Sequence, residues 1–421
     1  MIDIRLLREH PEVMRDNLRK RDSDWPLDRV LAADKEWREV LRKVEDLKAE
    51  RNRATMEMAK LDAKEREPRR AKLKKLNDEI THAEQKQEAL AKEVRDALLV
   101  SPNILHERVP KGKDDSENVP LRKEGKLPKF GFTPKDHIGI GLSLGLFDFD
   151  KAAEASGARF YYLKNEAVFL ELALMRYALD TTTKKGFTPL ITPNLLRYWV
   201  LEGAGYFPKF REDTYKIDGE DLYLVGTSEQ AITAIHANET LREEDLPLRY
   251  TAFSPCYRTE VGAHGRDTKG VIRVHQFDKV EQFVFCHPND AWKEFDRLQR
   301  NHEEILEGLG IPYQVVEICT GDIGIVAARK LDTEGWFPAQ QKYRELSSCS
   351  NCTDYQARRL NVRLAGGGFV HTLNCTALPS PRTLACVLEN YQKEDGTVSV
   401  PKVLQPYMNG IKEIALKKTK R

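Results

Sequence analysis

The sequence predicts an α+β protein, in which an N-terminal antiparallel two-helix coiled-coil arm precedes a domain with a mainly antiparallel sheet flanked by helices. Residues 31–100 contain no glycine and 34 charged residues, a composition typical of long helices. Their apolar residues recur at a coiled-coil spacing. Residues 112–421 hold all 25 glycines and mix strand-like with helix-like segments, without regular strand–helix–strand alternation.

Two stretches of alternating three- and four-residue spacing define the arm. The first runs from Trp37 to Leu61 and the second from Leu73 to Ala97. Such a repeat places one apolar seam along each helix. Pro68 lies between the stretches, and because a proline breaks a helix interior, we expect the chain to turn there. Two helices of ~30 residues at 1.5 Å per residue predict a hairpin roughly 45 Å long.

The expected tip of the arm is strongly basic. Residues 60–75 hold eight basic and three acidic side chains, a local charge of +5. Such a charge suits phosphate contact. Because no aromatic residues interleave the basic ones, structured RNA that is read by its shape fits better than a stacked single strand. Two plainer interpretations stay open, a dimerisation device and a solvated turn.

The expected domains are residues 1–105 for the arm, 106–135 for a linker and 136–421 for the C-terminal domain. Prolines and glycines punctuate the linker, as is typical of irregular connections. A chain of 421 residues is long enough for two or three domains of ~100–200 residues each.

The composition argues against a membrane-spanning or disulfide-stabilised chain. The protein carries 68 basic and 66 acidic side chains, and no run approaches the ~20 apolar residues of a membrane helix. Its N-terminus lacks the apolar core of a signal peptide. The seven cysteines are odd in number and begin at Cys256, so we expect a reducing, cytoplasmic setting. Cys349-x-x-Cys352 supplies only half of a structural zinc site, and we expect no zinc.

Periodicity within the C-terminal domain locates several of its elements. Helices are predicted over Glu166–Asp180 and Glu294–Leu309. Strands are predicted over Leu222–Val225, Val271–His275 and Val280–Phe285.

The strongest chemical signal is a predicted hairpin with two arginines and an aromatic ring. Because alternate residues of a strand point to one face, Arg258 shares a face with Glu260. In the partner strand Arg273 shares a face with His275 and Phe277. Guanidinium groups bind phosphates and carboxylates, and an arginine opposite an aromatic face can sandwich a purine. Since the chain has no glycine-rich phosphate loop, a nucleotide would be held by side-chain clamps. A surface hairpin with ordinary ion pairs is the plainer alternative.

Arg258-x-Glu260 followed by Arg273-x-x-x-Phe277 resembles the second signature motif of class II aminoacyl-tRNA synthetases. With further segments, the whole chain resembles the seryl-tRNA synthetase family, and its N-terminal hairpin matches that family's arm. These segments are Gly205–Phe210, Thr227–Glu229, His275–Gln282, Ser347–Cys352, Gln356–Arg359 and Leu388–Gln392.

The resemblance implies a two-step reaction. L-serine attacks the α-phosphate of ATP, giving seryl-adenylate and pyrophosphate, and the seryl group then passes to the 3′ end of tRNA(Ser), or of tRNA(Sec) in a host that has it. It also implies that residues 1–105 bind tRNA, that residues 136–421 form the class II catalytic domain, and that Gly186–Pro193, which resembles the first class II motif, builds a homodimer interface.

The resemblance also implies the site residues. The catalytic ones are Arg258, which bridges the serine carboxylate and the α-phosphate, Glu345, and Arg382, which clamps the γ-phosphate. Serine is read by Thr227, Ser228, Glu229, Arg258, Glu281, Asn374 and Thr376. ATP is bound by Arg258, Thr259, Glu260, Arg273, Val274, Phe277, Glu345, Leu346, Ser347, Ser348 and Arg382, and Mg²⁺ by Glu345 and Ser348. Taken alone, Glu281 equally suits an ion pair with Lys279 or an edge position of the sheet.

Two rival functions stay open on the sequence. One is a related enzyme that charges another acceptor, such as a carrier protein, and the other is a non-catalytic coiled-coil RNA-binding protein. Gly335 departs from the family, which usually has an apolar residue there, and a glycine weakens a strand.

Overall fold

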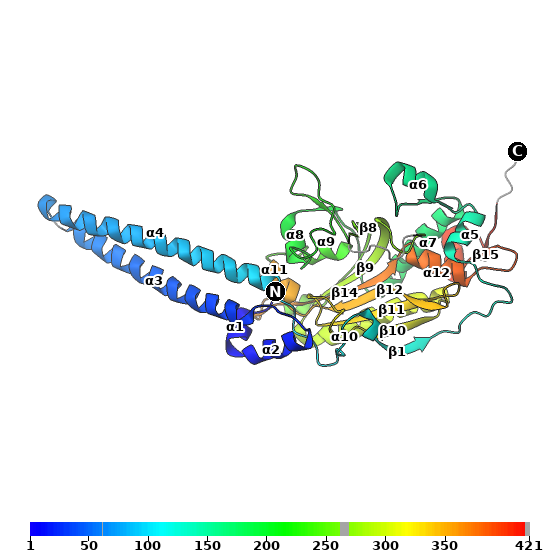
Figure 1. The fold of residues 1–421 in the computed structure, drawn as a ribbon, viewed down its shortest axis with the longest axis horizontal. Coiled ribbons are helices and arrows are strands. Elements are labelled where there is room, and N and C mark those ends of the chain that lie inside the picture. Colours follow the sequence, from blue (N-terminus) through cyan, green and yellow to red (C-terminus); the bar gives the residue numbers. More distant parts are fainter. Residues whose placement is uncertain (61, 262–268, 417–421) are drawn as a thin grey trace. The chain divides into compact units, whose positions relative to one another are not determined.

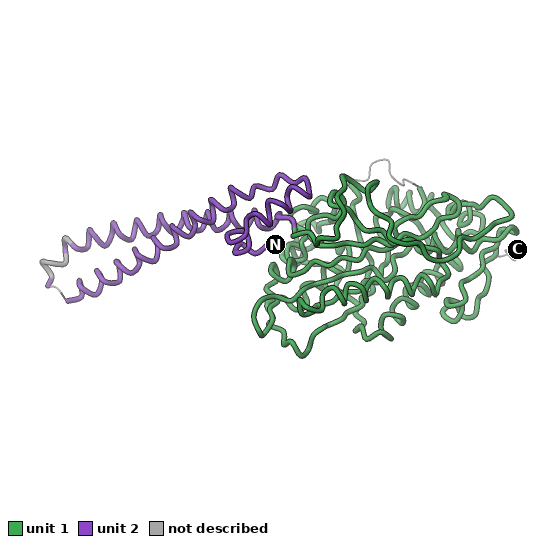
Figure 2. The backbone as a smooth tube through the Cα atoms, turned by 90° about the horizontal axis from the view of Figure 1, so that it is seen from below, with its two compact units in different colours: residues 1, 103–421 green, residues 2–102 purple. Residues whose placement is uncertain are grey.

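The computed structural model describes residues 1–60, 62–261 and 269–416. The chain divides into two compact units, residues 2–102 and residues 1 with 103–421 (Figure 2). The first unit therefore ends close to the expected arm boundary at residue 105. Residues 106–135, expected as a linker, contribute strand β1 (Val119–Glu124) to the sheet of the second unit.

The arm is the antiparallel helical hairpin that the sequence predicts. After the short helices α1 (Ile4–Glu9) and α2 (Pro11–Lys20), α3 (Leu27–Ala59) and α4 (Ala63–Leu99) pack side by side (Figure 1). The predicted seam residues form its core, among them Val40, Val44, Ala83 and Leu90. Ion pairs such as Glu36–Lys86 and Lys48–Glu84, at 2.6 and 2.7 Å, join the two helices.

The predicted turn at Pro68 is wrong. The turn lies between Ala59 and Ala63, and Pro68 falls in the second turn of α4. The first N–H groups of a helix have no intrahelical acceptor, so a proline this near the start removes about one internal hydrogen bond. Leu61, at the end of the first predicted seam, lies outside the described residues.

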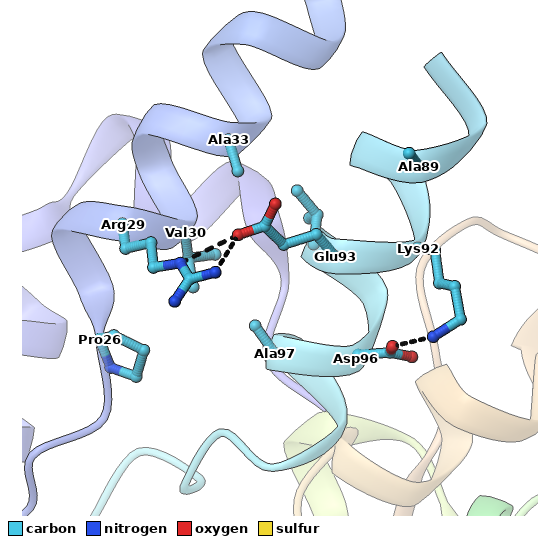
Figure 3. Close-up of a pocket in the computed structure, with 10 residues that line it drawn as sticks. Pro26, Arg29, Val30, Ala33, Ala89, Lys92, Glu93, Asp96 and Ala97 are labelled. Carbon is cyan, nitrogen blue, oxygen red and sulfur yellow. Dashed lines mark hydrogen bonds and ion pairs between the residues drawn. The ribbon is translucent and has the colours of Figure 1, made fainter. Parts of the chain in front are cut away.

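At the end of the arm opposite the turn, α3 and α4 leave a groove between them (Figure 3). Arg29 donates from Nε and Nη2 to Glu93 Oε1 at 2.9 and 2.8 Å, and Lys92 pairs with Asp96 at 2.5 Å. The rest of the lining is proline, valine and alanine. The charges in this groove are thus already paired, and the groove offers no group for catalysis.

An eight-stranded, mainly antiparallel sheet forms the centre of the second unit. Its order is β1-β10-β11-β12-β14-β9-β8-β4, and only β4 and β8 pair in parallel. The strands are β10 (Tyr313–Glu317), β11 (Arg329–Phe337), β12 (Lys342–Asn351), β14 (His371–Pro379), β9 (Gln276–Cys286), β8 (Leu248–Tyr257) and β4 (Thr188–Ile191). Two-residue strands pair as β2 (Phe147–Asp148) with β3 (Tyr162–Leu163), β5 (Leu195–Leu196) with β6 (Tyr223–Leu224), β7 (Thr240–Leu241) with β13 (Arg363–Leu364), and β15 (Val398–Ser399) with β16 (Glu413–Ile414).

Helices flank this sheet, as predicted (Figure 1). The α-helices are α5 (His137–Ser143), α6 (Phe149–Ser156), α7 (Glu166–Lys184), α8 (Tyr198–Gly203), α9 (Ser228–Thr233), α10 (Ala291–Leu309), α11 (Tyr355–Leu360) and α12 (Arg382–Asn390). Short 3-10 helices occupy Asp115–Glu117, Glu243–Asp245, Pro288–Asp290 and Lys402–Met408. The helices predicted from periodicity correspond to α7 and α10.

Strand alternation separates the core from a polar face. In β9, Val280 and Val284 belong to the large apolar core, to which α7, α10 and α12 also contribute. Lys279 and Glu281, one position out of phase, line a cavity. The same division in β14 places Leu373 and Cys375 in the core. Because successive side chains of a strand point to opposite faces, one sheet supplies both the core and the site.

Of the predicted strands, Val280–Phe285 lies within β9 and Leu222–Val225 contains β6. The strand predicted over Val271–His275 is wrong, since β9 begins at Gln276. The N–H of Val271 donates to His137 Nε2 at 3.4 Å and that of His275 to Arg159 O at 3.2 Å, so these two N–H groups do not pair with β8. The carbonyl of His275 still accepts from Arg258 N at 2.9 Å, one position beyond the end of the ladder. Of the residues that connect the two strands, 262–268 lie outside the described residues.

Gly335 lies inside β11, where it pairs with Tyr313 of β10 and Arg344 of β12. A Cβ atom at this position would lie 2.4 Å from Leu346 Cδ1 and 3.2 Å from Cys386 Sγ. Leu346 and Cys386 belong to the core, and they fill the space that a side chain at residue 335 would need.

In the parts of the chain that the structure describes, no helix is both long and apolar enough to cross a membrane. All seven cysteines are free and buried.

Candidate active site

A cavity of about 640 Å³ lies on the polar face of the sheet, between β8, β9, β11, β12, β14, α9 and the segment after α8. It brings together nearly all of the predicted site residues. Ser228 and Thr259 are the exceptions: Ser228 is fully buried, and Thr259 donates from Oγ1 to Glu212 O at 2.7 Å. The predicted residues that line the cavity are Thr227, Glu229, Arg258, Glu260, Arg273, Val274, Phe277, Glu281, Glu345, Leu346, Ser347, Ser348, Asn374, Thr376 and Arg382.

Arg258, directly after β8, is held over Phe277 of β9. Its guanidinium carbon lies 5.1 Å from the ring centroid, and its Nε donates to Gly226 O at 3.3 Å. The neighbouring Arg273 donates to Glu260 at 2.6 Å. The hairpin therefore presents an arginine and an aromatic ring as predicted, although Arg273 precedes β9 and does not share its face through strand alternation.

Arg382, the first residue of α12, is tied to two other walls of the cavity. Its Nε donates to Ile272 O at 3.0 Å, and its Nη1 donates to Glu345 Oε2 at 3.1 Å. Desolvation raises the pKa of Glu345, but the charges of Arg382 and Lys330 outweigh it and hold this pKa at about 2. Glu345 is therefore ionised at neutral pH.

Five cationic side chains line the cavity, and four of them form an ion pair with a carboxylate of the chain. Arg273 pairs with Glu260, Lys279 with Glu281, Lys330 with Asp332 and Arg382 with Glu345. Among the described residues, no carboxylate forms an ion pair with the fifth, Arg258. An unneutralised guanidinium in a cleft is suited to bind a phosphate or carboxylate of a ligand.

The opposite end of the cavity is lined by buried carboxylates and hydroxyls. Thr376 of β14 donates to Glu281 of β9 at 3.2 Å, a contact set by the register in which these two residues pair. Thr227 caps α9 and accepts from Lys279 Nζ at 2.7 Å. Glu281 is 1% exposed. Glu281 therefore forms the ion pair with Lys279 that the sequence allows, and it also lines the cavity.

Glu229 is the second buried carboxylate at this end. It accepts from Tyr206 OH at 2.9 Å, from Gln356 Nε2 at 2.9 Å and from Asn374 Nδ2 at 3.2 Å. Burial raises the pKa of Glu229, and so does the charge of Glu281, whereas the hydrogen bonds from Tyr206 and Gln356 lower it.

Sequence reasoning missed several polar residues of this site. Lys279 entered only as a possible partner of Glu281, and Tyr206, Gln230 and Lys330 were assigned no role although they line the cavity. Lys330 had a usable signal, since Lys330 and Asp332 alternate along β11 on the face that carries Ser348 of β12. Tyr206 lies in a segment that carries the family resemblance, but nothing in that segment assigns it a role, and Gln230 carries no local signal. The fold brings both residues to the cavity.

Beneath the turn that leads into Arg382 lies a buried carboxyl group. Ser380 Oγ donates to Glu171 Oε2, and Ser380 N donates to Asp278 O at 2.8 Å. Burial raises the pKa of Glu171 to about 8, with a smaller contribution from Asp278. Glu171 is thus mostly protonated at neutral pH and contacts the turn before Arg382 as a neutral group.

Comparisons with known proteins identify the family of this chain. Residues 1–105 match the model of the seryl-tRNA synthetase N-terminal domain, and residues 210–391 that of the tRNA synthetase class II core domain (G, H, P, S and T). A serine–tRNA ligase of Methanoregula boonei is 46% identical, covering 97% of this chain and 99% of that protein.

Two solved structures are similar over almost the whole chain. The seryl-tRNA synthetase of Pyrococcus horikoshii complexed with ATP has a TM-score of 0.92 and 44% identity, covering 99% of this chain and 100% of that one. The cytoplasmic serine–tRNA ligase of Naegleria fowleri in complex with AMP has a TM-score of 0.89 and 38% identity, covering 99% of each chain.

The fold and the cavity define a class II aminoacyl-tRNA synthetase, a ligase. Within that class, the chain belongs to the seryl-tRNA synthetase family, whose reaction activates L-serine with ATP and transfers it to tRNA. The fold class and the resemblance predicted from the sequence are both confirmed.

The raised pKa of Glu171 predicts a pH dependence of stability. Between pH 4.5, the ordinary pKa of a glutamate, and about pH 8, Glu171 keeps its proton in the folded protein but loses it in the unfolded chain. Its contribution to the free energy of unfolding is therefore complete below the ordinary pKa and is lost as pH rises through about 8. At ~1.4 kcal/mol per pKa unit, the free energy of unfolding should fall by about 3 kcal/mol between pH 5 and 8, relative to Glu171→Gln. Denaturant unfolding across this range measures it, with Glu154→Gln on the exposed face of α6 as the control. Parallel profiles of wild type and Glu171→Gln would contradict the assignment.

Proposed function

We propose that this cavity carries out both steps of seryl-tRNA formation with the residues described above. L-serine and ATP form seryl-adenylate and pyrophosphate, and the seryl group then passes to the 3′-terminal adenosine of tRNA(Ser), or of tRNA(Sec) where the host has it. The single observation that carries the proposal is Arg258, a cavity cation without a carboxylate partner in the described chain, between the serine end and the nucleotide end.

At the nucleotide end, the proposed roles follow from chemistry and position. The adenine stacks on Phe277, with Glu260 and Val274 beside it. Arg258 bridges the α-phosphate and the serine carboxylate, and Arg382 binds the γ-phosphate. Because the reaction is an in-line displacement, holding these groups in place and neutralising charge supply most of the catalysis.

At the serine end, an ammonium and a hydroxyl group must be recognised. Glu281 and Glu229 supply negative charge for the ammonium group, and Thr227, Asn374 and Thr376 supply hydrogen-bonding groups around them. A pocket that hydrogen-bonds a substrate hydroxyl rejects an analogue without it by roughly 10⁴-fold, because its buried polar groups are left unpaired.

Mg²⁺ is the cation that this reaction requires, and the donor set fits it. The ionised Glu345 and the hydroxyl of Ser348 both lie on β12 and line the cavity, and hard cations prefer oxygen ligands together with phosphates and waters. When bound, Mg²⁺ neutralises phosphate charge. Glu345 and Ser348 would hold it beside Arg382.

Residues 1–105 are proposed as the tRNA-binding arm and 136–421 as the catalytic domain. The basic residues of the tip, among them Arg69, Arg70 and Lys72, are exposed and suit a phosphate backbone. This function replaces the dimerisation device and the solvated turn as the interpretation of the arm.

A homodimer is proposed on exposed apolar residues of the Gly186–Pro193 segment and of α7. Ile191, on the edge strand β4, is 85% exposed, and Phe169 and Leu172 of α7 are 45% and 59% exposed. Exposed apolar side chains and an edge strand suit pairing with a second copy. The free cysteines support a reducing, cytoplasmic location.

Serine-dependent exchange of pyrophosphate into ATP tests the function. We expect exchange with serine, and exchange with alanine slower by roughly 10⁴-fold because alanine lacks the hydroxyl group. Arg258→Ala should lower kcat/KM by at least ~10²-fold, since its guanidinium faces the reacting phosphate. Arg242→Ala, an exposed arginine of the same unit that pairs with Asp245, is the matched control. Absence of exchange in the pure protein would refute the proposal that it activates serine. Full activity of Arg258→Ala would favour the non-catalytic RNA-binding alternative.

Deletion of residues 40–95 tests the acceptor. Apart from the turn between the helices, these residues belong to α3 and α4, outside the unit that holds the cavity. Exchange should therefore stay within about twofold of wild type, whereas serylation of tRNA(Ser) should be lost with the phosphate contacts. Unchanged serylation after the deletion would support the alternative in which another acceptor is charged.

A further inference from the structure

Gln356 of α11 is a buried residue that has no role in the proposed mechanism. The segment Gln356–Arg359 is one of those that carry the family resemblance. Gln356 is fully buried and does not itself line the cavity. Its amide nevertheless meets three other elements of the unit, and one of these contacts is to a carboxylate of the serine end.

The amide of Gln356 has a partner for each of its groups. Nε2 donates to Glu229 Oε1 at 2.9 Å and to Ala204 O at 3.0 Å, and Oε1 accepts from Thr372 Oγ1 at 2.7 Å. A carboxylate and a backbone carbonyl only accept, so the amide nitrogen must face Glu229 and Ala204. The orientation of the side chain is therefore fixed by its surroundings.

Glu229 is held by this amide from behind and by two other donors. Tyr206 OH and Asn374 Nδ2 approach it at 2.9 and 3.2 Å. Tyr206 and Asn374 line the cavity, where a substrate can displace them, whereas Gln356 lies outside it. Gln356 is thus the one of the three donors that is out of reach of a ligand.

We propose that Gln356 is a positioning residue for the amino-acid substrate, which fixes the carboxylate of Glu229 so that it faces the ammonium group of serine. The proposal rests on the proposed serine site. It follows from the geometry because a carboxylate that is free to rotate loses part of its hydrogen bonding to a ligand. Burial raises the pKa of Glu229, and the hydrogen bond from Gln356 acts in the opposite direction.

Three variants test the proposal through separate KM values for serine and ATP in the exchange reaction. In Gln356→Leu the donor to Glu229 is lost, and the KM for serine should rise about 10- to 100-fold, the range expected for a hydrogen bond to a charged group. The KM for ATP should change by less than about twofold. Thr372→Val is the matched control: it removes the bond to Gln356 Oε1 but keeps both bonds from Nε2, so its KM for serine should change by less than about threefold.

Gln356→Glu adds a second measurement, the pH dependence of the KM for serine, which would not change if Gln356 only supported the fold. It places a second carboxyl group against Glu229, and two carboxyl groups this close share one proton. The KM for serine should therefore be high at pH 8 and fall toward the wild-type value at pH 6, where the shared proton restores a donor. The other ionisable groups around Glu229 are Tyr206, Cys352, Lys279 and Glu281, and they are the same in both Gln356 variants.

The results of these variants distinguish a positioning role of Gln356 from a purely structural one. An unchanged KM for serine in Gln356→Leu, equal losses for serine and ATP, or a pH-independent KM in Gln356→Glu would overturn the positioning role. Absence of serine-dependent exchange in the wild type would instead refute the proposed function, so the two failures are distinguishable.

Discussion

Arg258 stands in the cavity without a carboxylate partner in the described chain, whereas the other four cations that line the cavity are each paired. Partly buried charges are costly unless neutralised, so the paired residues form a stable polar wall in the absence of substrate. The guanidinium of Arg258 is stabilised more weakly, by the Phe277 ring and the carbonyl of Gly226. It is therefore the cavity cation that is most available to a phosphate or carboxylate of a ligand.

The sheet makes this distribution of charge possible. Four neighbouring antiparallel strands, β11, β12, β14 and β9, direct alternate side chains into the apolar core and into the cavity. The pairing of Thr376 with Glu281 is one consequence of their register. The close packing of Leu346 and Cys386 around Gly335 is a second consequence, because it leaves no room for a methyl group at residue 335. Core packing and cavity chemistry are thus coupled through the same strands.

Local sequence patterns predicted the features that local physics determines. The heptad seam gave the arm its core residues, and helical periodicity gave α7 and α10. The hairpin motif and the family resemblance gave most of the cavity lining. Pro68 and the Val271–His275 segment were misjudged because the outcome depends on where the hydrogen-bond partners lie, which propensity does not report. Gln356 and Tyr206 could not be assigned from their own segments, since each donates a hydrogen bond to Glu229, a residue distant in sequence.

The most direct test of the central claim is a crystal structure with a non-hydrolysable seryl-adenylate analogue, such as seryl-sulfamoyl adenosine. The account predicts that the guanidinium of Arg258 lies within hydrogen-bond distance of the group that replaces the α-phosphate, while the ammonium group of the ligand lies against Glu281 and Glu229. A ligand bound with Arg258 turned toward a protein carboxylate, or with its amino-acid end away from these two residues, would contradict it.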